Sequence, residues 1–125
     1  MKYFLLSLLL ALLSACGSSR KPPSESDLQK IRFDLSQLDD KGLRGPEGGK
    51  TALDYEFCIP RDEALRREVE GIDPTLVVQT AAGRIGCSPE QYLCIGNTHQ
   101  ARFRAVLYRL AALSYVDRIE QAFWE

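Results

Sequence analysis

The sequence lacks three features that would point to common classes of function: an excess of charge of one sign, an apolar run long enough to cross a membrane, and a Cys-x-x-Cys pair. Its 125 residues carry 16 Lys and Arg against 17 Asp and Glu, which gives a formal net charge of −1. This overall charge implies neither nucleic-acid binding nor adsorption to an anionic membrane. The apolar run at residues 4–13 is shorter than the about 20 residues of a spanning helix. Without a Cys-x-x-Cys pair, the usual zinc-binding spacing is missing.

Catalytic motifs are also scarce. His99 is the only histidine, and a catalytic role for it would need a nucleophile or a carboxylate placed beside it by the fold. Gly96-Asn97-Thr98 precedes an expected helix and offers backbone N–H groups to an anion, but it is not a glycine-rich phosphate loop. Asp54 and Glu56 share one face of an expected strand, where a solvated surface explains both carboxylates. We therefore expect no enzymatic activity and no cofactor.

The N-terminus has the order of a bacterial export signal. Met1-Lys2-Tyr3 is positively charged, and residues 4–13 suit the hydrophobic segment of a signal peptide. The run ends in Leu13-Ser14-Ala15-Cys16, which resembles the lipobox of bacterial lipoproteins. The resemblance implies that the Cys16 thiol receives a diacylglycerol, that the chain is cut before Cys16, and that the new amine is acylated by a fatty acid such as palmitate. Two or more acyl chains anchor a protein stably, whereas one binds only marginally.

The same resemblance predicts where the protein resides. Residues 1–15 would be removed, and the lipid bilayer would be a partner through acylated Cys16. Gly17 stands where the inner-membrane retention signal of the family often has Asp, which favours the outer membrane, facing the periplasm. An ordinary secretory peptide with a chance cysteine is the alternative.

We expect the part after the cleavage site to divide at Lys50. Residues 16–50 have the composition of a lipidated N-terminus and flexible tether, because 17–26 is small, polar and proline-bearing and 41–50 is rich in glycine. Residues 28–38 fit one helical stripe, whereas 31–35 alternates as a strand does, so a short helix or a loose segment is expected there. Residues 51–125 form the expected folded domain.

The pattern of residues 51–125 predicts a small α+β domain. Residues 53–59 alternate as a half-buried strand. Pro60 can open a helix with an apolar stripe of Leu65, Val69 and Ile72, for which Gly71 is the expected C-terminal cap. Two more strands, 75–80 and 92–95, flank a turn at 88–91, and a second helix covers about 98–113. The tail 118–124 is expected as a last strand with Ile119 and Phe123 inward, although it also fits a continued helix. This order predicts a ferredoxin-like βαββαβ antiparallel sheet with both helices on one face.

Three cysteines remain after the lipidated one: Cys58, Cys87 and Cys94. An exported location favours disulfides, and an odd number leaves one thiol unpaired or intermolecular. If the first and third strands are parallel neighbours, Cys58 lies on the face away from the helices. Tyr92, Cys94 and Gly96 would share that face, because Leu93 and Ile95 are assigned to the core.

These placements predict a Cys87–Cys94 disulfide that closes the hairpin around Ser88-Pro89, with Cys58 unpaired. A Cys58–Cys94 disulfide is the alternative. A metal site is a further alternative, because Cys58, Cys87, Cys94 and His99 supply three thiolates and one imidazole, a set that suits Zn²⁺. Thiol redox chemistry is another, and it requires an exposed cysteine of low pKa near a resolving partner.

No family resemblance extends to residues 51–125. We expect a membrane-anchored cell-envelope lipoprotein whose small non-catalytic domain binds or scaffolds an envelope protein or a small ligand. The alternative is a small thiol-redox or metal-binding envelope protein that uses Cys58, Cys87, Cys94 and His99.

Overall fold

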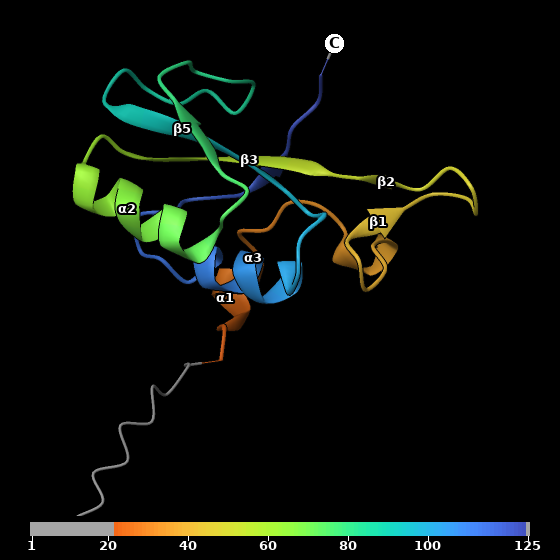
Figure 1. Ribbon diagram of the computed structural model, residues 1–125. Helices are drawn as coiled ribbons and strands as arrows, with labels where there is room; N and C mark the ends of the chain where they lie inside the picture. The colour runs from red at the N-terminus through yellow and green to blue at the C-terminus, as the bar shows by residue number, and fades with distance from the viewer. Residues whose placement is uncertain (1–21, 125) are drawn as a thin grey trace, which may run out of the picture.

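The structure, a computed structural model, describes residues 22–124, in which helices lie against a four-stranded sheet (Figure 1). The helices are α1 (Glu25–Leu28), α2 (Glu63–Ile72) and α3 (Phe103–Ala111), and a 3₁₀ turn covers Leu35–Gln37. The strands are β1 (Leu43–Arg44), β2 (Thr51–Ala52), β3 (Asp54–Pro60), β4 (Val77–Gln79), β5 (Gln91–Asn97) and β6 (Glu120–Gln121). The expected signal peptide, 1–15, and the lipidation site, Cys16, lie outside the described residues.

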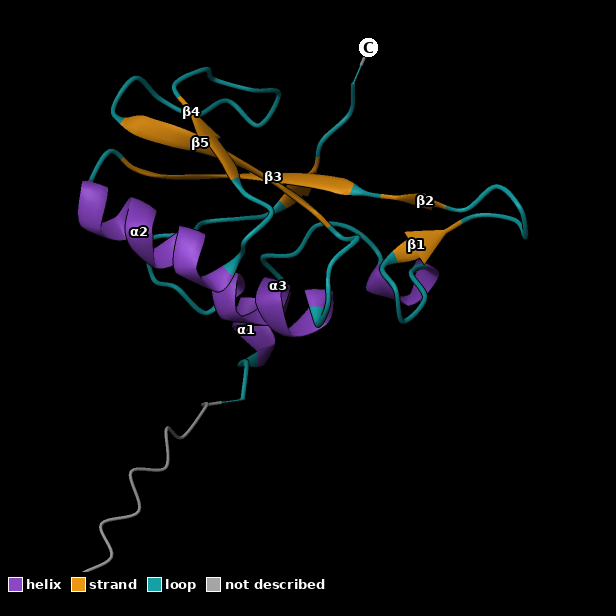
Figure 2. Ribbon diagram, viewed as in Figure 1, coloured by secondary structure: helices purple, strands orange, loops and turns teal. Residues whose placement is uncertain are grey.

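The strands form two antiparallel sheets, so the expectation of a small α+β protein is confirmed. The larger sheet has the order β4-β5-β3-β6, and β1 and β2 form a separate hairpin. Figure 2 shows the helices gathered on one face of the larger sheet. The expected parallel pairing of the first and third strands of this sheet is wrong, because β3 and β5 are antiparallel. The chain reverses between β4 and β5, and this reversal sets the direction of β5 against β3.

The main core lies between the sheet and the helices. Tyr55, Phe57 and Ile59 are fully buried, as the alternation of β3 predicts. They pack with buried residues of α2 and α3 (Val69, Ile72, Phe103, Val106, Leu107 and Leu110). Burying each such side chain contributes about 1.5–3 kcal/mol to the hydrophobic free energy of folding.

The two faces of β5 are the reverse of the expected ones. The register places Cys94 opposite Phe57 and Leu93 opposite Cys58. Directly opposite residues of antiparallel strands share a face, so Cys94 points into the main core and Leu93 points away from the helices. The expected faces are wrong because Leu93 does not need the helices for its burial: Ile85 and Cys87 cover it on the other face of the sheet.

The two longer helices, α2 and α3, begin with different kinds of N-terminal residue. Asp62 caps α2, since its side chain accepts hydrogen bonds from the backbone N–H groups of Ala64 and Leu65. The start of α3 lies later than expected, after Arg102, whose backbone is left-handed with φ of 58°. Thr98 is instead fully buried, and its hydroxyl accepts from the Leu53 N–H and donates to the Gly42 carbonyl oxygen.

The boundary expected at Lys50 is wrong, because residues 24–50 belong to the folded unit. Leu38 is buried in the main core. Ile31 forms a parallel bridge with Ile119, in which the Arg32 N–H donates to the Ile119 carbonyl at 2.8 Å. The glycines of this segment form turns in place of a linker, and Gly42, for example, has φ of +74°. A glycine-rich composition therefore marked the turns of a hairpin.

The tail forms a strand, as expected, and does not continue the helix. β6 pairs with β3, Tyr55 lying opposite Gln121. Ile119 is buried as expected, but Phe123 is 58% exposed and Ala122 is buried in its place. The alternation breaks after two paired residues, where the Ala122 N–H donates to the Asp54 carbonyl.

Candidate functional site

The structure joins Cys58 to Cys87 in a disulfide, with a Cα–Cα separation of 5.5 Å. The predicted Cys87–Cys94 bond and the alternative Cys58–Cys94 bond are both corrected by this pairing. Cys94 is a free, buried cysteine, and it lies on the helix face of the sheet. It therefore cannot meet either of the other two sulfurs through the sheet.

The disulfide fastens residues 80–88 over the outer face of the sheet, the face away from the helices. Buried Cys87 packs there with Ile85 and Leu93. The carboxylate of Glu56, which is only 5% exposed, accepts a hydrogen bond from the Ile85 N–H at 2.7 Å. The Arg118 guanidinium donates to the Ile85 carbonyl at 2.8 Å. The disulfide and Glu56 thus have a structural role, and Glu56 is not part of the solvated carboxylate pair expected from the sequence.

Cys94 is poorly suited to thiol chemistry. Burial, followed by the negative charge of Glu70, raises the pKa of its thiol to about 12. Since the thiolate is the reactive form of cysteine, the protonated thiol behaves as a small apolar core group.

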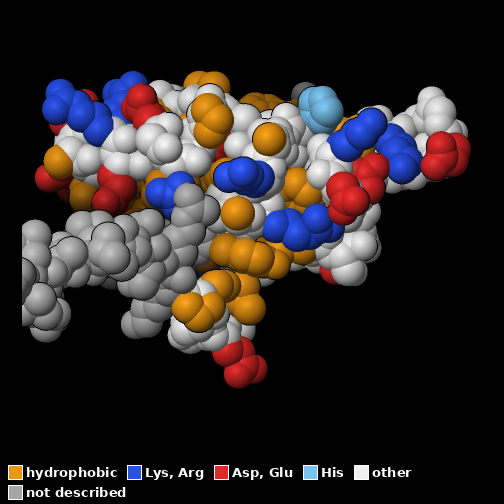
Figure 3. All heavy atoms as spheres, turned by 60° about the horizontal axis from the view of Figure 1, so that its bottom comes forward, with side chains coloured by type: hydrophobic (Ala, Val, Ile, Leu, Met, Phe, Trp, Pro, Cys, Tyr) orange, Lys and Arg blue, Asp and Glu red, His pale blue; other side chains and the backbone are white. Residues whose placement is uncertain are grey.

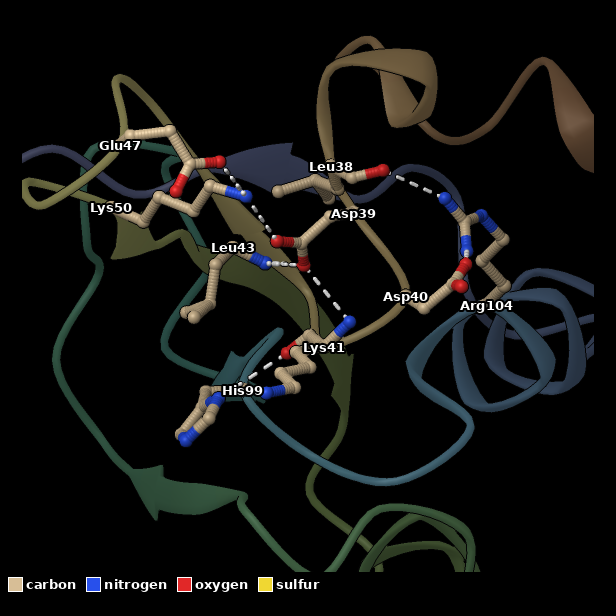
Figure 4. A network of polar contacts seen from close by, with 9 residues as sticks. All are labelled: Leu38, Asp39, Asp40, Lys41, Leu43, Glu47, Lys50, His99 and Arg104. Carbon is tan, nitrogen blue, oxygen red and sulfur yellow. Dashed lines mark hydrogen bonds and ion pairs between the residues drawn. The ribbon is translucent and has the colours of Figure 1, made fainter.

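His99 lies on the surface of the loop after β5, beside the turn that precedes β1 (Figure 4). Its ring Nδ1 is 3.2 Å from the Lys41 carbonyl oxygen, and its backbone N–H donates to Asn97. The neighbouring carboxylate, Asp39, accepts from the backbone N–H groups of Leu43 and Lys41 and from the Lys50 ammonium at 3.0 Å (Figure 4). The Leu43 hydrogen bond and then Lys50 lower the pKa of Asp39 to about 2, so this carboxylate holds a turn.

The alternative metal set is not assembled. Cys58 and Cys87 are bonded to each other, Cys94 faces the main core, and His99 lies on a surface loop. In residues 22–124, no group of three or more His, Cys, Asp and Glu side chains is arranged to hold a metal ion.

A buried polar network, not foreseen from the sequence, joins β3 to the end of α2. Asp73, only 1% exposed, accepts hydrogen bonds from the Tyr55 hydroxyl, from Thr75 and from the Gln100 amide. Burial and the charge of Asp73 raise the pKa of Tyr55 well above its ordinary value. The phenol therefore stays protonated and acts as a donor.

Gly96 makes this network possible. A Cβ at Gly96 would lie 2.5 Å from the Tyr55 ring and 2.7 Å from Asp73 Oδ2. A glycine inside a strand often marks such a close approach, and this was the one signal in the sequence that could have located the network. The Gln100 Oε1 atom is buried without a partner among the described residues. The network links the sheet, α2 and the loop before α3, which is a structural role.

The outer face of the sheet also carries an exposed apolar surface next to β4. A hollow of about 260 Å³ is lined by residues that include Asp54, Val77, Ile95, Asn97 and Trp124. Val77 is 61% exposed and Trp124 is 69% exposed. Asp54 accepts hydrogen bonds from the Trp124 indole at 2.6 Å and from the Asn97 amide at 2.7 Å. We call this set of five residues the edge surface.

The edge surface combines an exposed aromatic side chain with a few oriented polar groups, two features that recognition surfaces share. Sequence patterns do not reveal the edge surface, because Asp54, Ile95 and Trp124 lie far apart in the chain. The terminal Phe123-Trp124 pair was the only hint, and it had been assigned in part to the core.

No protein-family model, curated protein or solved structure matches this chain. Within residues 22–124, every helix falls short of the length and apolar content that crossing a bilayer requires.

Proposed function

We propose that the chain is a membrane-anchored cell-envelope lipoprotein whose α+β domain is non-catalytic and binds another envelope component. The observation that carries the proposal is the Cys58–Cys87 disulfide, because such bonds persist mainly outside the reducing cytosol. This argument for export is independent of the Leu13-Ser14-Ala15-Cys16 pattern. The buried titratable groups, Glu56 and Asp73, support the non-catalytic part, since both are occupied by structural hydrogen bonds.

The edge surface is the proposed binding site, and an extended segment of another envelope protein is the proposed partner. β4 is an edge strand, and within the described residues it pairs only with β5. A free strand edge offers backbone N–H and C=O groups to an added strand, while adjoining pockets select side chains. Exposed Val77 and Trp124 would supply apolar contacts beside that edge.

We also propose that the larger sheet with α2 and α3 is a ferredoxin-like βαββαβ unit, to which α1 and the β1–β2 hairpin are additions. Three observations support this assignment: the element order from β3 to β6, the antiparallel pairings, and a sheet order in which the first and third strands are central.

Anchoring is tested by changing Cys16→Ser. We expect the variant to lose lipidation and either to leave the membrane fraction or to remain uncleaved, as judged by fractionation and intact mass. A Cys16→Ser protein that is still mature, lipid-modified and membrane-bound would refute the anchor.

Binding is tested by placing a photoreactive amino acid at Val77 in cells, with Glu47, whose side chain is 97% exposed, as the control position. We expect a discrete crosslinked species from position 77 only. It should disappear when Trp124→Ala is added, because that change removes the aromatic anchor of the edge surface. Crosslinks that are equal from both positions, or unaffected by Trp124→Ala, would contradict the assignment.

Thiol-redox function is the second candidate, and it would use Cys58 and Cys87. Cys58 is half-buried and lines a small hollow of about 200 Å³ together with Arg118 and Asp117, so a reductant could approach the disulfide from this side. Trapping of thiols in intact cells tests this candidate. A fully oxidised pair under all growth conditions would leave the disulfide a purely structural role.

A further inference from the structure

A groove runs between α2 and α3 on the side of these helices turned away from the sheet. It has a volume of about 700 Å³, and Ile72, Ala105, Tyr108 and Leu113 contribute to an apolar lining. Pro22 and Pro23, the first described residues, also line it. We call this feature the helix groove. Figure 3 shows hydrophobic and basic side chains next to each other on this face of the molecule.

Three arginines border the helix groove and have no partner among the described residues. Arg67 of α2 and Arg109 of α3 line it, and Arg102 lines an adjoining hollow of about 260 Å³ that shares Ile72, Ala105 and Arg109 with it. Within residues 22–124, none of these three guanidinium groups has an ion pair or a hydrogen bond. The one acidic residue in the lining, Glu68, accepts a hydrogen bond from the Tyr115 hydroxyl. The groove therefore carries a local positive excess that the balanced overall charge conceals.

The position of the groove in the chain points to its occupant. Five residues lie between Cys16 and Pro22, and the six Cα–Cα steps across them, at about 3.3–3.6 Å each, span at most about 22 Å. A chain that is lipidated at Cys16 thus holds the rim of the groove close to the phospholipid headgroups. Arg20 and Lys21, which lie in that short connection, would add positive charge in the same region.

We propose that the helix groove docks onto the bilayer that carries the anchor, with the phosphate of an anionic phospholipid between Arg67 and Arg109 and its glycerol and acyl part against the apolar lining. This inference rests on the proposed lipid anchor and adds an orientation to it. Guanidinium groups bind phosphate through paired N–H donors, and basic residues near an anionic leaflet each strengthen membrane association roughly fivefold. Docking by this face turns the edge surface, on the opposite side of the sheet, away from the membrane and towards a partner.

The single tryptophan of the chain allows a direct test. The mature lipidated protein is reconstituted with Tyr108→Trp and Trp124→Phe, so that the only indole lies in the helix groove. A parallel sample with Ala112→Trp in place of Tyr108→Trp reports from an exposed position that also lines the groove. Each is placed in vesicles that contain a headgroup-nitroxide lipid, made of phosphatidylcholine either alone or mixed with phosphatidylglycerol. The parent protein, with its indole at Trp124, reports on the opposite face.

We expect the groove indoles to be quenched strongly, and more so with phosphatidylglycerol, while the indole of Trp124 is quenched little. Adding Arg67→Ala and Arg109→Ala should reduce several-fold the extra quenching that phosphatidylglycerol causes. Lys41→Ala with Arg44→Ala removes the same charge from the β1 side of the molecule and should leave the quenching unchanged.

Three results would overturn docking. The first is groove indoles that remain unquenched in protein that floats with the vesicles. The second is quenching that responds neither to phosphatidylglycerol nor to the Arg67 and Arg109 changes. The third is quenching of the groove indoles that decreases as the protein concentration rises. This result would assign the groove to a second copy of the chain. Intact mass separates these failures from failure of the anchor, because a chain without the added lipid mass overturns both proposals.

Discussion

The two faces of the larger sheet are held in different ways. The helix face buries Tyr55, Phe57 and Ile59 completely under α2 and α3, and its stability comes from apolar area. The outer face has no helix over it in residues 22–124 and is closed by the loop 80–88, which is fixed by a disulfide and by the buried carboxylate of Glu56. A domain with too little chain to cover both faces by packing can thus fasten one of them by specific bonds. The same sheet then offers its uncovered part, the edge surface, for binding.

Removing residues 22–50, which contribute side chains to the helix face, should lower the stability more than any other change considered below. We expect residues 51–125 alone to be much less stable than residues 22–125, because they lose Leu38 from the core and the Phe33 ring that stacks on Tyr55 at 6.3 Å. Loss of one buried leucine side chain costs about 2–5 kcal/mol. Thermal unfolding and amide exchange of the two fragments provide the measurement. Equal melting temperatures would show that residues 24–50 are dispensable and would restore the tether assigned from the sequence.

The second largest loss of stability should follow from breaking the Cys58–Cys87 disulfide of the outer face. Reduction, or the double change Cys58→Ser and Cys87→Ser, should lower the free energy of unfolding by about 3.5 kcal/mol, since the disulfide closes a loop of sequence separation 29. Amide exchange should increase in residues 80–88 and much less in α2 and α3. Non-reducing peptide mapping gives the pairing itself. A map that joins Cys94 to either partner would contradict the structure.

Two glycines allow a matched comparison on the helix side. Gly96→Ala should destabilise the protein by about 1–3 kcal/mol, because its Cβ would meet the Tyr55 ring at 2.5 Å. Gly71→Ala should stabilise it by about 0.5–1 kcal/mol, because Gly71 lies within α2 and its Cβ would meet nothing within 4 Å. Chemical denaturation of both variants checks the opposite signs. Destabilisation by both changes would mean that the α2 surface is more crowded than described.

At neutral pH the smallest effect comes from Cys94, whose contribution to stability depends on pH only above about pH 9. Its folded pKa is raised to about 12 from 9.0, so the unfolded chain releases a proton at a lower pH than the folded chain. Stability is therefore complete below pH 9 and falls above it, by about 1.4 kcal/mol per pH unit at most. Cys94→Ala should remove this part of the decline, as shown by unfolding curves between pH 8 and pH 11. An identical decline in the variant would assign it to other groups.

Local patterns in the sequence predicted the parts of the fold in which one physical signal dominates. The alternation of residues 53–59 identified β3 and its buried face, and the apolar stripe of Leu65, Val69 and Ile72 identified α2. The order of elements also gave the α+β class, and the tail formed a strand. In β3 and α2 the large apolar side chains are confined to one face of the element, which makes their period decisive.

The wrong or missed predictions concern features that a local sequence pattern does not determine. Alternation in β5 shows which residues share a face but not which face they share, and here both faces are covered, so Leu93 and Cys94 were exchanged. That exchange produced the wrong disulfide. The edge surface and the Tyr55–Asp73 network were missed because they are formed by residues distant in sequence, and glycine turns in residues 41–50 were interpreted as a linker.

The parallel bridge between Ile31 and Ile119 affects the order in which parts of the molecule should unfold under a stretching force. A pull on the N-terminus reaches the hydrogen bonds that Lys30 and Arg32 share with Ile119 before it reaches any strand of the larger sheet. The next link, β6, is paired to β3 over only two residues, whereas β3 and β5 are in register over seven. Tension should therefore peel off the bridge and β6 first and spare the β3–β5 pair until later. Optical-tweezer traces would show a short extension before the main rupture, and a single rupture would refute this order.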